Sequence, residues 1–190
     1  MRATKTLPVT YKLRGTFYLS NPKIIVGLNV AATVSFVLWS ILFLMIVAWL
    51  RPEMGSIEGR IGLPQILLIL ALPIASIVLH ELVHGVFLWL FTREWPRFGF
   101  KGLFAYASSP GWYMPRNQYF VVALAPFVLI TLAGLGCLWL LPQFAILPLV
   151  FILATNAAGA IGDLTIIGWI FTRLPVEFVS ETNTLDVTIY

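Results

Sequence analysis

Four long apolar runs dominate the chain, and each is long enough to cross a lipid bilayer as a helix. The runs cover residues 24–50, 61–92, 119–141 and 142–171. A membrane-spanning helix needs about 20 residues. The last two runs together are far too long for one crossing, so we predict a tight turn at Pro142. The pattern predicts an all-α integral membrane protein with four transmembrane helices in a single membrane-embedded domain over residues 1–190.

The connection between the second and third runs, residues 93–118, is rich in aromatic side chains. Phe98-Gly99-Phe100 and Phe104-Ala105-Tyr106 alternate around Lys101-Gly102, which is typical of a β-hairpin. Aromatic residues favour the boundary between membrane and water. We therefore expect an interfacial or partly re-entrant hairpin-like loop. The polar tail, residues 174–190, also alternates in its apolar positions, which favours a short strand.

Composition and charge agree with a membrane protein and give it an orientation. Hydrophobic residues make up 59% of the chain and charged residues only 11%, against about 25% charged residues in a soluble domain. The formal charge of +4 comes from basic residues between apolar runs, which disfavours nucleic-acid binding. These residues gather before the first run and between the second and third. The positive-inside rule therefore predicts that both termini are cytoplasmic.

The second run contains an HExxH motif, His80-Glu81-Leu82-Val83-His84, with the only two histidines of the chain. Residues four apart share a helix face, so both imidazoles can bind one metal ion. Glu81 can then act as general base on a water molecule at the metal. Ionisable groups within a bilayer are costly and usually functional, which disfavours a purely structural polar cluster. We predict one zinc ion bound by His80 and His84, with Glu81 as the catalytic residue.

A third ligand is expected, because zinc hydrolases commonly use three protein ligands. A longer form of the motif would place it at position 90, but this residue is Leu90, and Glu94 lies in a charged loop. Asp163 is the only other acidic residue in an apolar run. His80 and Asp163 precede the ends of their runs by similar lengths, so parallel helices bring them to the same depth. Asp163 is therefore favoured, with Glu94 as the alternative.

Asn156 shares a helical face with Asp163, because the two are seven residues apart. Gly159 and Ala160 lie on the same face and allow a partner helix to approach closely. Asn156 could donate a hydrogen bond to a substrate carbonyl or its oxyanion. It could equally form an interhelical hydrogen bond without a catalytic role, and the sequence leaves both interpretations open.

These motifs resemble those of the site-2 protease class of intramembrane zinc metalloproteases. Residues 80–85, residues 116–126 (RNQYFVVALAP) and residues 156–164 are more closely similar to a bacterial family of membrane zincin peptidases. The resemblance implies a multi-pass protein of a bacterial cell membrane, with the ligands and base assigned above. The chain departs from the site-2 protease pattern because it lacks a proline between Asn156 and Asp163 and has Leu164 after the aspartate.

The sequence thus predicts an intramembrane zinc metalloprotease that hydrolyses membrane-associated or transmembrane proteins with metal-activated water. An extended substrate could pair with the edge of the hairpin by strand addition. The alternative is a catalytically silent zinc-binding protein with a regulatory or chaperone-like role. A membrane enzyme with a non-peptide substrate would use the same ligands. A transporter is disfavoured, because the ionisable groups lie at one depth. The oligomeric state and the substrate are not predicted.

Overall fold

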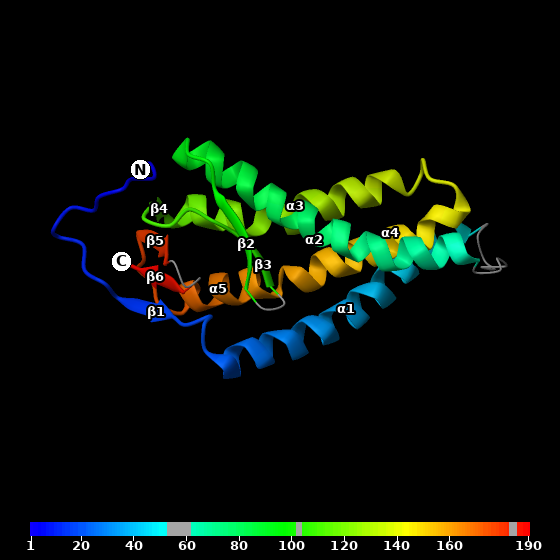
Figure 1. The fold of residues 1–190 in the computed structure, drawn as a ribbon, viewed down its shortest axis with the longest axis horizontal. Helices are drawn as coiled ribbons and strands as arrows, with labels where there is room; N and C mark the ends of the chain where they lie inside the picture. The colour runs from blue at the N-terminus through cyan, green and yellow to red at the C-terminus, as the bar shows by residue number, and fades with distance from the viewer. Residues whose placement is uncertain (53–61, 102–103, 183–185) are drawn as a thin grey trace.

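The computed structural model describes residues 1–52, 62–101, 104–182 and 186–190, and most of them form a bundle of long apolar helices (Figure 1). The helices are α1 (Pro22–Leu50), α2 (Leu63–Thr92), α3 (Arg116–Cys137), α4 (Gln143–Gly159) and α5 (Ile161–Phe171). In the described residues, four segments are long and apolar enough to cross a membrane, and α4 and α5 together form one of them. This confirms the helical segments predicted from the apolar runs.

Local sequence explains where α1 begins and which surface it presents. Asn21 accepts a hydrogen bond from the backbone N–H of Lys23, and Pro22 occupies the first helical position, where a missing N–H costs nothing. Along α1, apolar side chains such as Val26 and Val30 remain exposed. A helix with an apolar outer surface is suited to contact with lipid tails.

The third and fourth apolar runs are separated by a turn, as predicted. The backbone N–H groups of Leu140 and Leu141 both donate to the carbonyl of Cys137, at 3.0 and 3.1 Å. Pro142 then occupies the N-cap position of α4. The tight turn at Pro142 is confirmed.

The fourth run was expected to form one helix over residues 142–171, but it is interrupted at Ala160. The backbone N–H of Ala160 still donates to the carbonyl of Asn156 at 3.1 Å, so hydrogen bonding continues across the interruption. Gly159 and Gly162 flank it, and glycine is a weak helix former. The interruption divides the span into α4 and α5 close to the predicted site.

Helix α4 contacts α1, α2 and α3. Gly134 of α3 permits a close approach, because a Cβ atom there would lie 2.4 Å from Cδ2 of Leu153 on α4. Ser76 of α2 donates its hydroxyl hydrogen to the carbonyl of Ile152 on α4 at 3.0 Å. These contacts hold α2 and α4 together, and both helices contribute residues to the site described below.

The predicted hairpin is present between α2 and α3. Strands β2 (Arg97–Lys101) and β3 (Phe104–Ser108) pair in antiparallel fashion, with Phe98 opposite Ala107. The intervening residues of the turn, 102–103, lie outside the described residues. The hairpin runs across the helical bundle (Figure 1), and β3 contacts α2 more extensively than β2 does. This confirms the hairpin, while its position in a membrane stays a prediction.

A four-stranded antiparallel sheet lies at one end of the bundle, where both termini are also found (Figure 1). Its order is β1-β6-β5-β4, so the two ends of the chain supply three of its strands. The strands are β1 (Gly15–Phe17), β4 (Tyr113–Pro115), β5 (Phe178–Glu181) and β6 (Val187–Ile189). The sheet is a correction to the all-α prediction, which allowed for the hairpin and one short strand in the tail.

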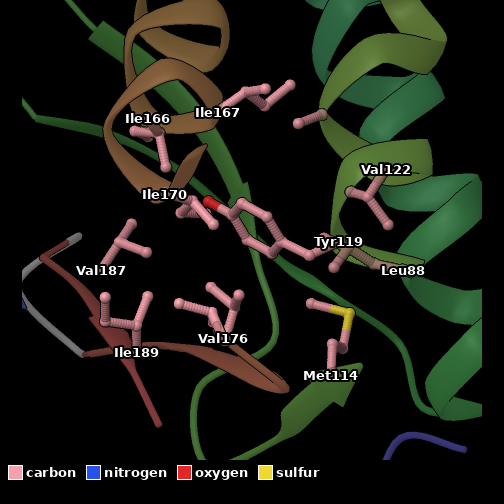
Figure 2. Close-up of a cluster of buried hydrophobic side chains, with 12 residues drawn as sticks. Leu88, Met114, Tyr119, Val122, Ile166, Ile167, Ile170, Val176, Val187 and Ile189 are labelled. Carbon is pink, nitrogen blue, oxygen red and sulfur yellow. The ribbon is translucent and has the colours of Figure 1, made fainter. Parts of the chain in front are cut away.

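The sheet forms because the tail carries apolar side chains that need a partner surface. Val176, Val187 and Ile189 pack with residues of α3 and α5 in one buried cluster. Figure 2 shows the ring of Tyr119 at the centre of this cluster, with its hydroxyl end toward Ile170. The tail is therefore a packed part of the fold, although its composition is polar.

Candidate metal centre

Helices α2 and α5 bring together the three residues that the sequence predicts as metal ligands. The Nε2 atom of His80 lies 3.3 Å from Oδ2 of Asp163, and Nε2 of His84 lies 3.4 Å from the same oxygen. One ligand atom from each residue lies within 4.8 Å of the others. Among the described residues, this is the one group of three such side chains close enough to hold a metal ion. The depth argument for Asp163 therefore agrees with the observed geometry.

In each imidazole, the nitrogen that is not directed at Asp163, Nδ1, forms a hydrogen bond with an oxygen atom. Nδ1 of His80 lies 2.9 Å from Oδ1 of Asn156, and Nδ1 of His84 lies 2.9 Å from the carbonyl oxygen of Val122. Because both oxygens can only accept, we assign the Nδ1 hydrogens as the donors. Each neutral ring then presents the lone pair of Nε2 toward Asp163. Outer contacts of this kind orient histidine ligands at metal sites.

A proline explains why the carbonyl of Val122 is available to His84. In α3, this carbonyl would normally accept the backbone N–H of the residue four positions later. That residue is Pro126, which has no N–H, so the carbonyl of Val122 has no partner in its own helix. The carbonyl of Pro126 in turn lies 3.4 Å from Nδ2 of Asn156 and accepts a hydrogen bond from it. One proline thus supports the outer contacts of both histidines.

The donor set fits a zinc ion. Zinc–ligand bonds of about 2.0–2.1 Å in tetrahedral geometry place two ligand atoms about 3.3–3.5 Å apart. The observed spacings of 3.3 and 3.4 Å from Asp163 to His80 and His84 fall in this range. Hydrogen bonds from both Nε2 atoms to an Asp163 carboxylate would require both rings to be positively charged, because their Nδ1 atoms already donate. Two imidazolium groups buried beside a single carboxylate are a poor alternative to one metal ion.

Burial and helix position support the same assignment. His80 and His84 are 4% and 7% exposed, and Asn156 is 1% exposed. Asp163 lies in the first turn of α5, where the positive end of the helix dipole favours a carboxylate. The interruption at Ala160 creates this helix start at the level of the histidines.

Glu81 lies between the two histidines of the motif and the hairpin. The backbone of Ala107, in β3, forms a hydrogen bond with the Glu81 carboxylate. A carboxylate can only accept, so the donor is the N–H of Ala107, on the strand edge that faces α2. This contact places the predicted base beside β3, within reach of a molecule bound at the histidines.

A glycine that directly follows the HExxH motif lets the hairpin approach α2. A Cβ atom on Gly85 would lie 2.4 Å from Cζ of Phe98 in β2 and 3.3 Å from Pro96. Phe98 pairs with Ala107 across the hairpin. The absence of a side chain at Gly85 therefore sets how closely the strand that bonds Glu81 can lie to the helix.

Comparison with known proteins agrees with this geometry. A family model described as "Putative zincin peptidase" matches residues 73–177, which is more than half of the chain. The chain belongs to this zincin peptidase family. No curated protein and no solved structure matches at the level required for significance.

The match spans most of the parts of the chain that build the site. It includes the HExxH helix, the hairpin, α3 with Pro126, and the span that carries Asn156 and Asp163. Helix α1 and the last two strands lie outside the matched residues. Zincins are metallopeptidases that bind zinc through HExxH, so family membership and the observed donor set agree.

The remaining sequence-predicted residues have definite places. Glu94, the alternative third ligand, is exposed and pairs with Lys5 and with the indole N–H of Trp112. These two partners hold the pKa of the Glu94 carboxyl below its usual range. It does not join the histidines. Asn156 forms the interhelical hydrogen bond that the sequence left open, and its role at a substrate oxyanion stays a prediction.

A cavity of about 360 Å³ lies beside the histidines and Glu81 and reaches the four-stranded sheet. Its volume falls at the lower end of the usual range for ligand pockets, about 300–1,000 Å³. The wall includes small or aliphatic residues from α1, α2, β3, α4 and α5: Leu28, Ala32, Ile77, Ala105, Ala158 and Gly162. The site thus opens into a mainly apolar space large enough for a short segment of a peptide.

One acidic residue of the cavity was missed from the sequence. Glu181, at the end of β5, lines the same cavity as Glu81. Burial raises the pKa of its carboxyl to about 7, and the Ser109 N–H and His84 act in the opposite direction. Glu181 lies about a hundred residues beyond the HExxH motif in a polar tail, so no local signal pointed to it. Only the pairing of the tail with the sheet brings it to the site.

Proposed function

We propose that this zincin peptidase is an intramembrane zinc metalloprotease that hydrolyses peptide bonds of membrane-associated or transmembrane proteins. The observation that carries the proposal is the convergence of His80, His84 and Asp163 beside Glu81 within apolar helices. A zinc ion bound there supplies a Lewis acid, which polarises a carbonyl and makes water a nucleophile near neutral pH. The arrangement of an HExxH helix and a later helix with Asn156 and Asp163 supports kinship with the site-2 protease class.

The protein's own groups then have separate tasks. Glu81 takes a proton from the attacking water and delivers it to the amine that leaves. The N–H of Ala107 holds the Glu81 carboxylate in place. Asn156 and the Val122 carbonyl hold the rings of His80 and His84 in the tautomer that leaves Nε2 free to bind metal. The apolar cavity keeps bulk water from the reacting groups.

The hairpin supports a way of presenting the substrate. Strand β3 pairs with β2 on one edge, and its other edge carries the Ala107 N–H toward Glu81. An extended peptide that adds to this edge, which pairs with no other strand among the described residues, would lie along the cavity, next to the base. Strand addition also exposes the backbone carbonyls, which a helical substrate would keep in its own hydrogen bonds.

Location and orientation complete the proposal. The exposed apolar side chains along the helices support a multi-pass protein of a cell membrane, as in bacteria. Strand β1 pairs with β6, so both ends of the chain lie on the same side, which an even number of crossings requires. The excess of basic residues on that side supports a cytoplasmic position for both termini.

The Glu81→Gln variant provides the decisive test. Purified wild-type protein and Glu81→Gln, both loaded with zinc, are incubated with apolar fluorogenic peptides in detergent micelles. We expect equal zinc content and a loss of at least about 100-fold in the rate for the variant, which is the usual contribution of a general base. A chelator should abolish wild-type cleavage, and added zinc should restore it.

Two other results would count against the proposal. Equal cleavage by wild type and Glu81→Gln would show that Glu81 is not the base. Zinc binding without cleavage of any peptide, together with unchanged cellular function of Glu81→Gln, would support the catalytically silent alternative.

A further inference from the structure

A partly buried carboxyl group in the wall of the cavity, that of Glu181, has no task in the proposed hydrolysis. Glu181 lies where β5 ends and pairs with Val187 of β6, which also lines the cavity. Among the described residues, the carboxylate of Glu181 accepts a long hydrogen bond from the backbone N–H of Ser109, with 3.4 Å between the nitrogen and Oε2. The hydroxyl of Ser109 is itself buried without a hydrogen-bond partner among the described residues. The polar side chains at this end of the cavity therefore have few hydrogen bonds within the described part of the protein.

The charges that act on Glu181 do not neutralise it. Its electrostatic neighbours are His84, Asp163 and Glu81, two of which are acidic. Among the described residues, no lysine or arginine forms an ion pair with it. A carboxylate at Glu181 is therefore a negative charge in a largely apolar cavity, with no basic side chain paired to it among the described residues, which is costly unless it gains a partner.

We propose that Glu181 is a substrate-binding residue that pairs with a cationic amine or guanidinium near the scissile bond. The proposal rests on the proposed peptidase function and adds a substrate class to it: apolar peptides with one positive charge at this position. The cavity favours such a peptide, because its remaining wall accepts aliphatic side chains. The charge could come from a lysine or arginine side chain or from a free N-terminal amine.

Binding can be measured without cleavage in the Glu81→Gln background. The probes are fluorescent apolar peptides of one sequence in detergent micelles, with a single lysine moved along the sequence and norleucine as its neutral control. The lysine and norleucine peptides have an acetylated N-terminus. A second set lacks lysine and has a free N-terminus, so the two sources of positive charge are tested separately. Each peptide is titrated against Glu81→Gln and against Glu81→Gln/Glu181→Gln.

We expect one lysine position, or the free amine, to bind Glu81→Gln about 10- to 100-fold more tightly than its neutral control. The additional Glu181→Gln change should remove this preference and leave the affinity of the neutral peptide within about twofold. Glu181→Asp, which keeps the charge, should restore part of it. If the double variant does not fold, the preference within Glu81→Gln alone tests the proposal, and its absence overturns it.

Other outcomes separate this inference from the proposed function. If wild type cleaves the peptides but shows equal kcat/KM for charged and neutral members, the cationic subsite is wrong and the peptidase stands. If no peptide is cleaved and yet charged peptides bind through Glu181, the peptidase fails and the subsite stands. A drop in zinc per chain in Glu181→Gln would overturn the inference, because Glu181 would then belong to the metal site.

Discussion

At the scale of single residues, the site depends on groups that do not touch the metal. The HExxH motif predicted His80, Glu81 and His84, and the depth of the helices predicted Asp163. The contacts behind the histidines were less visible from sequence. A proline in an apolar helix predicts a kink and a backbone carbonyl without its helical hydrogen bond. One sequence does not show which side chain will donate a hydrogen bond to that carbonyl.

Replacing Pro126 tests whether this carbonyl matters. Pro126→Ala supplies a backbone N–H that competes for the carbonyl of Val122. This competition weakens the hydrogen bond between that carbonyl and Nδ1 of His84. We expect zinc affinity to fall about 10- to 100-fold, as for other groups that orient histidine ligands. Competition with a chromophoric chelator measures this affinity. Pro148→Ala, in α4 outside the site, is the control and should keep the affinity of wild type.

Asn156 can be assigned by separating zinc affinity from turnover. Asn156→Ala removes the acceptor at Nδ1 of His80, so we expect about 10- to 100-fold weaker zinc binding. At saturating zinc, kcat should recover to a large extent. Normal zinc affinity with a strongly reduced kcat would instead favour the oxyanion role.

Glu181 predicts a dependence of stability on pH. Its native pKa of about 7 lies above the ordinary value of 4.5, so the native state retains a proton that the unfolded chain releases. Its contribution to stability therefore falls as pH rises from about 4.5 to 7 and levels off above that. In metal-free protein, Glu181→Gln should raise Tm by a few degrees at pH 8 relative to wild type, and less at pH 5. Parallel Tm curves for the two proteins would contradict this.

At the scale of elements, the length of each helix or strand determined whether it could be predicted from the sequence. Long apolar runs have one stable solution in a bilayer, so the helices and the turn at Pro142 were predictable. The hairpin was also predictable, because two alternating segments flank a short turn. Alternation in the tail predicted a strand there, but β1 and β4 contain three residues each, too few for alternation to be recognised. They form through partners distant in sequence, as in the pairing of Gly15 with Ile189.

The hairpin provides the test at this scale. Ala107→Pro removes the N–H that bonds Glu81, on the strand edge that does not pair with β2. We expect kcat to fall about tenfold or more with zinc content unchanged, because the base loses its orientation while the ligands remain. Ala107→Ser keeps the N–H and serves as the control. Unchanged peptide hydrolysis by Ala107→Pro would show that the hairpin does not position the base.

At the scale of the whole molecule, the fold joins an apolar helical bundle to a sheet in which three of the four strands come from the ends of the chain. The helices set the depth of the metal ligands, and the sheet closes the cavity with Glu181. Sequence predicted the first part because composition and helix length are local properties. The second part depends on pairings between segments that are distant in the sequence, such as Pro115 with Phe178 and Gly15 with Ile189, which one sequence does not reveal.

The central claim is that one divalent ion joins α2 to α5, and metal content tests it most directly. Wild type, His80→Ala, Asp163→Ala and Glu94→Gln are purified in parallel, and their bound zinc is measured by mass spectrometry. The account predicts about one zinc ion per chain in wild type and Glu94→Gln, and a large loss in the other two variants. Full zinc content in Asp163→Ala, with loss in His80→Ala, would contradict it.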